Sequence, residues 1–455
     1  MKKVGLIGIG WHARRVYVPW LSQARTRRAL LQDDQTPEYL WTVGVDLESA
    51  APQILSALGE TEVPLLFSPT AAHEPIAPEV LSQLEAMCRA GELDTLIISV
   101  DPIGRRGWIE WALRHDLDLL IDKPLTAPRH AQTYHDVSRA LHRDVSEIHS
   151  ALERSRSRLW IQAQRRFHHG YLMMRQLVEE VTAQSGVPIT HLDISHADGM
   201  WVMPHEWDRD HHPYQHGWGK LLHSGYHFVD LAAWLMDADQ APKNEALHMS
   251  LNATSVSARE QSARLRHQQM IKPPELERLG DLSGERHGEV DLFVIGKLSE
   301  GQHARTTLNL QLMQSSISRR PSGDPPVDPY KGAGRIRHER VSVHVGPLLK
   351  IEVHSYQSHE VRDPNPQREY GPGHLDHFDL HIYRSPLLDG PRFERREIGG
   401  ALGVSSSHHI GHNERARISL LETFLGGDER GSSLEEHIRT HELICAIYDQ
   451  LGEER

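Results

Sequence analysis

The stretch that decides the fold is residues 3–13, KVGLIGIGWHA. It begins with a short, mostly apolar run, as expected for a strand that is buried on both faces of a parallel sheet. The run leads directly into a G-x-G-x-x-A motif, which opens a predicted helix over residues 13–24. In this context the first glycine permits a tight turn, the second lets the backbone approach a pyrophosphate, and the small third residue lets the helix pack closely on the strand. We therefore predict a dinucleotide site formed by Gly8, Gly10, Trp11, His12, Ala13 and Arg14, with a glycine turn that binds nothing as the alternative.

A carboxylate at the end of the second predicted strand supports this site. Residues 40–46 form another buried strand, and Asp46 at its end is suited to accept hydrogen bonds from a ribose 2′-hydroxyl. Asp46 comes 36 residues after Gly10, whereas about 20 residues is usual, so we interpret the polar residues 23–39 as an insertion. Because Leu47 rather than an arginine follows Asp46, NAD is the expected cofactor, and Arg14 with its neighbour leaves NADP open.

Apolar strands and amphipathic helices alternate through the first third of the chain. Further buried strands are predicted over 94–100 and 117–122, and a last one within 158–167, with helices between them at 49–58, 78–91, 105–115 and 128–155. This alternation is typical of a doubly wound parallel sheet with helices on both faces. We therefore predict a Rossmann domain over residues 1–167.

Residues 168–455 follow a different pattern and are predicted to form an α+β domain. Six segments alternate apolar and polar residues, as in a large, open, mostly antiparallel sheet: 191–196, 248–258, 290–298, 304–313, 340–345 and 349–356. Such a sheet has one covered face and one face open to solvent or to a partner subunit, so we expect a homodimer or homotetramer formed through it. Insertions are predicted near 259–288 and 315–338, and a closing helix over 433–451 with a Ser-x-x-Glu start.

The composition excludes several classes of function. A net charge of −12 argues against a nucleic-acid-binding protein, which needs a basic surface. No stretch approaches 18 uninterrupted apolar residues, so we expect no membrane-spanning helix. The two cysteines, Cys88 and Cys445, are too few and too far apart for a disulfide scaffold, which favours a cytoplasmic protein.

Four short motifs occur in the order typical of one family of enzymes. They are residues 101–102 (DP), 122–125 (DKPL), 164–167 (QRRF) and 217–230 (GWGKLLHSGYHFVD). Together with the glycine loop, this chain resembles the Gfo/Idh/MocA oxidoreductases, named for glucose-fructose oxidoreductase and inositol dehydrogenase. The sequence departs from that family's pattern at Asp122, where glutamate is usual, and at His223, where aspartate is usual.

The resemblance implies a set of site residues. Lys123 would lie beside the nicotinamide and polarise or protonate the reacting oxygen, Pro124 would follow a cis peptide bond, and His227 would be the catalytic histidine, with His223 beside it. Asp101, Pro102 and Asp122 would complete the cofactor site. The substrate contacts would come from Lys123, His223, His227 and four further residues: Arg165, Arg166, Trp218 and Tyr226.

These residues lead to one main hypothesis and two alternatives. The main one is an NAD(P)-dependent oxidoreductase that transfers hydride between the cofactor and a secondary hydroxyl or ketone of a sugar, inositol or related polyol. The first alternative is an NAD-assisted glycoside hydrolase or lyase without net redox change, and the second is a non-catalytic NAD-binding regulator.

The histidines around residue 227 allow another interpretation. On a helix, His223, His227 and Asp230 would stand at i, i+4 and i+7, roughly on one face, where two imidazoles and a carboxylate could bind a divalent metal. Four further histidines lie nearby, at positions 205, 211, 212 and 216. Hydride transfer needs no metal, and simple structural histidines are a further alternative, so we predict no metal site.

Overall fold

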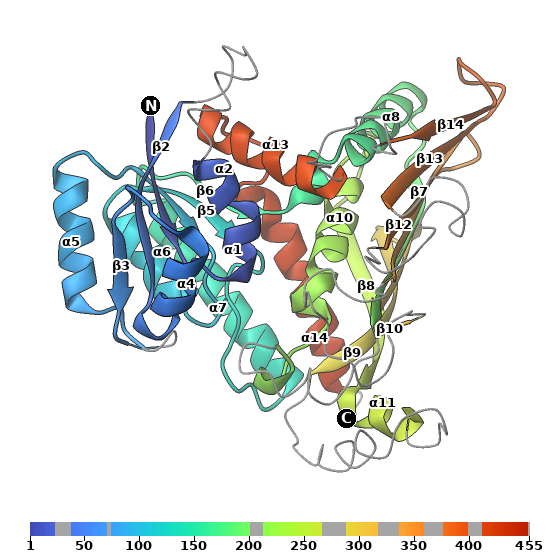
Figure 1. The fold of residues 1–455 in the computed structure, drawn as a ribbon. Coiled ribbons are helices and arrows are strands. Elements are labelled where there is room, and N and C mark those ends of the chain that lie inside the picture. The colour runs from blue at the N-terminus through green and yellow to red at the C-terminus, as the bar shows by residue number, and fades with distance from the viewer. Residues whose placement is uncertain are drawn as a thin grey trace, which may run out of the picture. The chain divides into compact units, whose positions relative to one another are not determined.

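The computed structural model divides into two compact units (Figure 1). It describes residues 1–22, 38–70, 74–200, 213–265, 288–316, 336–358, 376–398 and 412–453. The first unit comprises Met1–Pro128, Ala140–Phe167 and Glu414–His441. The second comprises Arg129–Arg139, His168–Asn413 and Glu442–Arg455. The first unit therefore contains a segment from near the C-terminus, which the sequence-based boundary at residue 167 does not include.

The first unit is built on a six-stranded parallel sheet, which confirms the predicted Rossmann fold. The strand order is β3-β2-β1-β4-β5-β6, the order of a dinucleotide-binding sheet. The strands are β1 (Lys2–Ile7), β2 (Tyr39–Leu47), β3 (Leu65–Ser68), β4 (Thr95–Ile98), β5 (Asp118–Asp122) and β6 (Leu159–Gln162). Of these, only β3 was not predicted, because its four residues follow a proline-rich polar stretch and are too few to show a pattern.

Helices surround this sheet, and two of them come from late in the chain. They are α1 (Trp11–Val16), α2 (Val18–Ser22), η1 (Glu48–Ala50), α4 (Ala51–Leu58), α5 (Pro78–Arg89), α6 (Arg105–Arg114), α7 (Tyr134–Leu152), whose residues from Ala140 on belong to this unit, η2 (Gln164–Phe167), α13 (His412–Gly426) and η5 (Glu435–His437). The late helix α13 was not predicted. It buries Leu420 and Phe424 in the same core cluster as Leu6 of β1 and Trp160 of β6. The backbone of Ser432 pairs with Ile161 of β6, and this pairing extends the contact of the C-terminal segment with the sheet edge.

The second unit contains an eight-stranded sheet in the order β14-β13-β12-β11-β7-β10-β9-β8. Every neighbouring pair is antiparallel except β7 with β10, so the predicted open, mostly antiparallel sheet is confirmed. The strands are β7 (Ile189–Met200), β8 (Leu247–Ser257), β9 (Glu289–Glu300), β10 (His303–Ser315), β11 (Ile336–Val345), β12 (Leu349–Ser358), β13 (Asp376–Arg384) and β14 (Phe393–Glu397). The last two were not predicted, and the mostly exposed FERRE of β14 has no apolar alternation to find.

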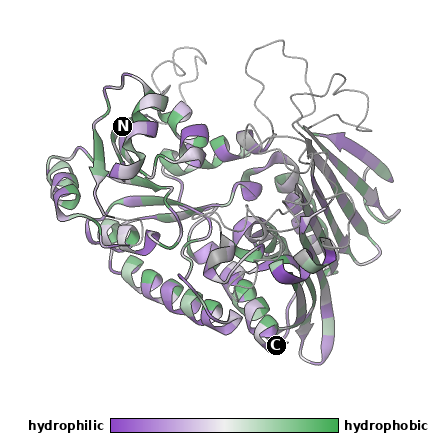
Figure 2. Ribbon diagram, turned by 60° about the horizontal axis from the view of Figure 1, so that its bottom comes forward, coloured by the Kyte–Doolittle hydropathy of each residue, from purple (hydrophilic) through white to green (hydrophobic). Residues whose placement is uncertain are grey.

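One face of this sheet is apolar and carries helices. Residues such as Val343 and Val353 are completely buried there, and α8 and α10 pack against this face (Figure 1). The ring of Phe228 on α10 stacks at 4.1 Å on His196 of β7. The alternate residues of the strands are hydrophilic and more exposed (Figure 2). The helices of this unit are α8 (His169–Ser185), η3 (Pro213–His216), η4 (Leu221–Gly225), α10 (Tyr226–Met236), α11 (Ala258–Leu265) and α14 (Ile438–Glu453), whose residues from Glu442 on belong here.

One sequence-based prediction about a helix is confirmed, and one helix was missed. The confirmed prediction is the Ser-x-x-Glu start: the Ser433 backbone donates to the Glu436 carboxylate at 2.9 Å, and the Glu436 backbone donates to Ser433 Oγ at 3.4 Å. The helix α8 was missed, although its buried Tyr171, Met174 and Val178 recur at helical spacing.

The two predicted insertions lie mostly outside the described residues, which omit 266–287 and 317–335. No described helix is long and apolar enough to cross a membrane.

Candidate functional site

The glycine loop lies at the carboxyl end of β1, and its first glycine is required by the neighbouring strand. Gly8 has a φ of +86°, a backbone conformation that favours glycine. A Cβ atom at this position would come within 2.8 Å of the backbone of Ser99, which follows β4. The Gly8 backbone also donates a 2.8 Å hydrogen bond to the Val45 carbonyl of β2. The turn at Gly8 is therefore packed closely between the ends of β2 and β4.

The second glycine of the loop meets a different environment. Gly10 has φ −67° and ψ −175°, an extended conformation open to any residue. A Cβ atom there would meet nothing within 4 Å. The protein's own packing therefore does not require glycine at position 10. The space beside it suits a ligand that approaches the backbone closely, as a pyrophosphate does.

Asp46 is held against this loop despite its distance along the sequence. Its two carboxylate oxygens accept the backbone N–H groups of Ile9, at 2.5 Å, and of Leu47, at 2.7 Å. The strands β1 and β2 are neighbours in the sheet, so the 36-residue separation from Gly10 is closed by strand pairing. Since a carboxylate offers about four lone-pair sites, this half-buried group keeps capacity for further donors such as ribose hydroxyls.

A buried hydrogen-bond network surrounds Asp122 at the end of β5. Its carboxylate accepts the hydroxyls of Tyr17 and Ser99, both at 2.5 Å. Burial alone would raise the pKa of this carboxyl, but the neighbouring His12 ring and Arg105 guanidinium, with the two hydroxyls, lower it below its ordinary value. Asp122 therefore remains ionised and holds α1 and the ends of β4 and β5 together.

His12 belongs to both the loop and this network. Its Nε2 atom lies 3.6 Å from Asp122 Oδ1. Burial lowers the pKa of His12 to about 4, and the nearby carboxylate offsets only part of that effect. The imidazole is therefore neutral at neutral pH. Trp11, by contrast, is 56% exposed beside it, and Arg14 lies 5.6 Å from the centre of the indole ring.

The Lys123–Pro124 peptide bond is cis, as the family resemblance implies. Arg105 fixes the backbone on both sides of Lys123, because its guanidinium donates to the carbonyls of Asp122 and Pro124. Lys123 itself is half-buried at the carboxyl end of β5. The predicted residues Gly8, Asp46 and Lys123 therefore share one edge of the parallel sheet, where ligands bind in such folds.

The remaining predicted residues of the first unit have structural contacts. Asp101 accepts the Ile103 backbone N–H at 3.0 Å, and the Pro102 carbonyl accepts that of Ala127 at 3.3 Å. Arg165 and Arg166, in the short helix after β6, are both buried. Arg166 donates to the Glu436 carbonyl at 3.0 Å, which links it to the C-terminal segment.

In the second unit, the predicted histidines lie at a junction between two helix types. His223 is in the π-helix η4, and His227 is in the first turn of α10 directly after it. Single π-turns occur often at functional sites. Both histidines are half-buried, whereas the predicted substrate contacts Trp218 and Tyr226 are buried.

The metal interpretation of this segment can be compared only with the residues that the structure describes. Within the described part of the chain, one group of three potential ligands has its donor atoms within 4.8 Å of one another, and it does not include His223, His227 or Asp230. Asp230 is completely buried in α10. Three of the other histidines named with this segment, at positions 205, 211 and 212, lie outside the described residues.

A buried lysine that the sequence analysis missed anchors the histidine segment. Lys220 is fully buried, and its Nζ atom lies 2.6 Å from Asp198 Oδ2, 3.0 Å from His196 Nδ1 and 2.9 Å from Ser224 Oγ. Ser224 also donates to Asp198 at 2.5 Å. These contacts tie both ends of η4 to β7. A lone lysine between Gly219 and two leucines was the sequence signal for such a residue.

Glu289 is a second buried charge that sequence reasoning missed. One carboxylate oxygen accepts the Leu221 backbone N–H at 2.8 Å and the Tyr448 hydroxyl at 3.2 Å. Burial raises the pKa of Glu289 to about 7, and these hydrogen bonds offset only part of the effect. The first residue of η4, Leu221, therefore donates its backbone hydrogen bond to a carboxyl group that changes protonation near neutral pH.

Comparisons with known proteins identify the fold. A scan against protein-family models gives no match, and no curated protein sequence matches the chain. Solved structures do match. An oxidoreductase from Agrobacterium radiobacter, in complex with NAD+, L-tartaric acid and magnesium, is 13% identical with a TM-score of 0.59, covering 100% of this chain and 97% of that chain.

Two further structures agree with it. The aldose-aldose oxidoreductase from Caulobacter crescentus, complexed with glycerol, is 14% identical with a TM-score of 0.57, covering 100% of this chain and 99% of that chain. The WlbA dehydrogenase from Bordetella pertussis, in complex with NADH and UDP-GlcNAcA, is 12% identical with a TM-score of 0.55, covering 100% and 98%. The chain shares the fold of these oxidoreductases.

The Lys220 cluster predicts a large stability effect. Replacing Lys220 by methionine leaves Asp198 buried without its main counter-charge, so the free energy of unfolding should fall by about 3–5 kcal/mol in urea titrations. Arg156→Met is the matched control, because Arg156 pairs with Asp116 at 2.9 Å but is 89% exposed, and its loss should cost much less than the loss of Lys220. Equal effects of the two substitutions would contradict the anchoring role.

The raised pKa of Glu289 leads us to predict that the stability of the chain depends on pH. The folded chain keeps the Glu289 proton up to about pH 7, whereas the unfolded chain loses it near the ordinary value of 4.5. The folded state therefore binds more protons between these values, and stability falls as the pH rises through this range. Glu289→Gln removes that loss, so relative to the parent it should gain roughly 2.5 kcal/mol between pH 5 and pH 8 in urea unfolding. The exposed Glu92→Gln should show no such pH-dependent gain.

Proposed function

We propose that this chain is an NAD(P)-dependent oxidoreductase that transfers hydride between the nicotinamide and a secondary hydroxyl or ketone of a sugar, inositol or related polyol. One observation carries the proposal: the Gly8–Ala13 loop leaves open space beside Gly10, next to the Asp46 carboxylate at the same sheet edge. The shared fold with oxidoreductases crystallised with NAD+ and NADH supports it.

The residues of the first unit fit a dinucleotide. The pyrophosphate would lie against the backbone at Gly10, where no side chain intrudes, and the ribose hydroxyls would donate to Asp46. We propose NAD as the main cofactor, because a second phosphate on the ribose would be repelled by the Asp46 carboxylate. Arg14, which reaches the Gln53 carbonyl at 3.4 Å, is the cation that could accommodate NADP.

The chemistry of the chain's own residues is proton management. The nicotinamide, when bound, accepts or supplies the hydride. Lys123, at the carboxyl end of β5, donates a hydrogen bond to the reacting oxygen of the substrate. His227 takes the proton of the substrate hydroxyl in the oxidative direction and returns it in the reverse direction. His223 is proposed as a further polar contact to the substrate, where the resembling family has an aspartate.

Dinucleotide binding is tested at Gly10. Gly10→Ala should leave stability unchanged, because the added Cβ meets no protein atom within 4 Å, but it should weaken binding of NADH at least tenfold. Isothermal titration calorimetry with NADH and with NADPH measures the affinity for each cofactor and therefore the cofactor preference. Gly426→Ala is the control, because it also adds a methyl group in open space but on α13, and should bind NADH normally. Unchanged NADH binding by Gly10→Ala would contradict the proposed site.

Catalysis is tested at Lys123 and His227. A panel of aldoses, inositols and sugar acids is followed by NADH absorbance with NAD and NADP. For the substrate that reacts, Lys123→Ala and His227→Ala should each lower kcat/KM by roughly 10²–10⁴-fold. The exposed Lys243→Ala should have no effect. Glycoside cleavage without net NADH formation would favour the hydrolase alternative, and activity retained in Lys123→Ala would contradict the assigned role.

A further inference from the structure

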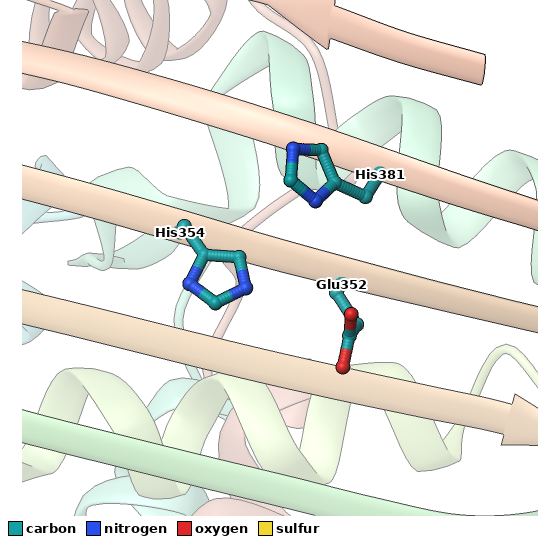
Figure 3. A group of neighbouring side chains, drawn as sticks. All are labelled: Glu352, His354 and His381. Carbon is teal, nitrogen blue, oxygen red and sulfur yellow. The ribbon is translucent and has the colours of Figure 1, made fainter. Parts of the chain in front are cut away.

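Two histidines and a glutamate lie together on the hydrophilic face of the eight-stranded sheet (Figure 3). Glu352 and His354 are two residues apart on β12, so their side chains point to the same face. His381 of β13 lies directly opposite Glu352 in the antiparallel register. Nitrogen and oxygen donor atoms of the three residues all lie within 4.8 Å of one another.

The backbone holds these side chains in a fixed arrangement. The strands β12 and β13 pair continuously from Leu349 to Gln357, so the site is built on two hydrogen-bonded strands and not on a loop. The ring centres of His354 and His381 are 5.5 Å apart. In a zinc site the ligand atoms lie about 2.0–2.2 Å from the metal and therefore roughly 3.4 Å from one another. To bind a zinc ion, the three side chains would have to rotate so that their donors, now within 4.8 Å of one another, reach that spacing.

We propose that Glu352, His354 and His381 bind one divalent transition-metal ion of the zinc class. Two imidazole nitrogens and one carboxylate oxygen are ligands that Zn²⁺, Co²⁺ and Ni²⁺ accept, with water in the remaining positions. Calcium and magnesium fit poorly, because they take six or more oxygen ligands and this group offers a single carboxylate.

The surroundings of Glu352 and His354 favour the forms of these two side chains that bind metal. The Lys350 ammonium lies 2.7 Å from one oxygen of Glu352 and leaves the lone pairs of the other oxygen to a metal. Burial would raise the pKa of Glu352, but Lys350 and the two histidines lower it. Burial, then His381 and Arg340, lower the pKa of His354, while Glu352 and Asp379 oppose them. The ring of His354 is therefore neutral at neutral pH, as coordination requires.

Two charged neighbours are engaged elsewhere. Arg340, opposite His354 on β11, pairs with Asp193 at 3.2 Å. Asp379, opposite His354 on β13, pairs with Arg395 at 2.8 Å. The net environment of the three ligands therefore carries no large excess of positive charge that would repel a divalent ion.

This inference does not rest on the proposed oxidoreductase function. The group belongs to the second unit and uses none of the residues assigned to the cofactor or to proton transfer. A bound ion would link β12 to β13 near one edge of the sheet, and would stabilise that pairing in proportion to the free metal concentration.

The test is metal binding by the full chain in its metal-free form. Isothermal titration with Zn²⁺ is compared between the parent chain and the variants His354→Gln, His381→Gln and Glu352→Gln. Because the chain contains 33 histidines, the difference between variants is the measurement. We expect each histidine variant to lose one bound equivalent or to bind that ion at least 100-fold more weakly, and Glu352→Gln to bind it at least tenfold more weakly.

The matched control is His344→Gln. His344 lies on the same face, in the neighbouring strand β11, with its ring 5.5 Å from that of His191 but outside the group of three. It should keep the full stoichiometry. Visible absorption of bound Co²⁺ gives a second readout, which should be lost in His381→Gln and kept in His344→Gln. Identical Zn²⁺ binding and Co²⁺ spectra in the parent and the two histidine variants of the group would overturn the proposal, as would the same loss in His344→Gln.

Discussion

The shared direction of six strands is the constraint on which the first unit depends. Because β1, β2, β4 and β5 are parallel and adjacent, their carboxyl ends meet at one edge of the sheet. That edge brings together residues that are far apart in the chain, and hydrogen bonds then fix them. The carboxylate of Asp46 holds the loop through Ile9, and the carboxylate of Asp122 holds α1 through Tyr17. The glycine loop is thus positioned by two carboxylates from two other strands.

Buried charges serve a similar purpose in the second unit. Glu289 accepts a hydrogen bond from the first residue of η4, and the Nζ atom of Lys220, the residue before η4, contacts Ser224 near its end. Burying either group without partners costs free energy. Lys220 Nζ contacts Asp198, His196 and Ser224, and one oxygen of Glu289 accepts hydrogen bonds from Leu221 and Tyr448. A π-turn is a less regular structure than an α-helix, and these contacts explain why this one is retained. His223 and His227 therefore lie on a segment that buried side chains hold in place.

The two faces of the large sheet have separate consequences. The apolar face packs against α8 and α10 and makes the core of the second unit. The hydrophilic face keeps histidines, carboxylates and cations in cross-strand register, where alternate residues of neighbouring strands are side by side. The group formed by Glu352, His354 and His381 depends on that register, because His381 is far from the other two in sequence and strand pairing brings it beside them.

The sequence by itself determined the class of fold and the positions of the glycine loop, because both depend on local patterns: buried runs such as residues 3–8, alternating runs such as 304–313, and the spacing of Gly8, Gly10 and Ala13. It missed α8, β3, β13, β14 and α13, among which β3 and β14 have too few patterned residues to stand out. Only the tertiary structure decided that α13 joins the first unit, that Asp46 contacts the loop, and that Lys220, Asp198 and His196 form one cluster. The physical reason is that these contacts join strands and helices from distant parts of the chain, and their partners are chosen by packing and strand register, which no local pattern encodes.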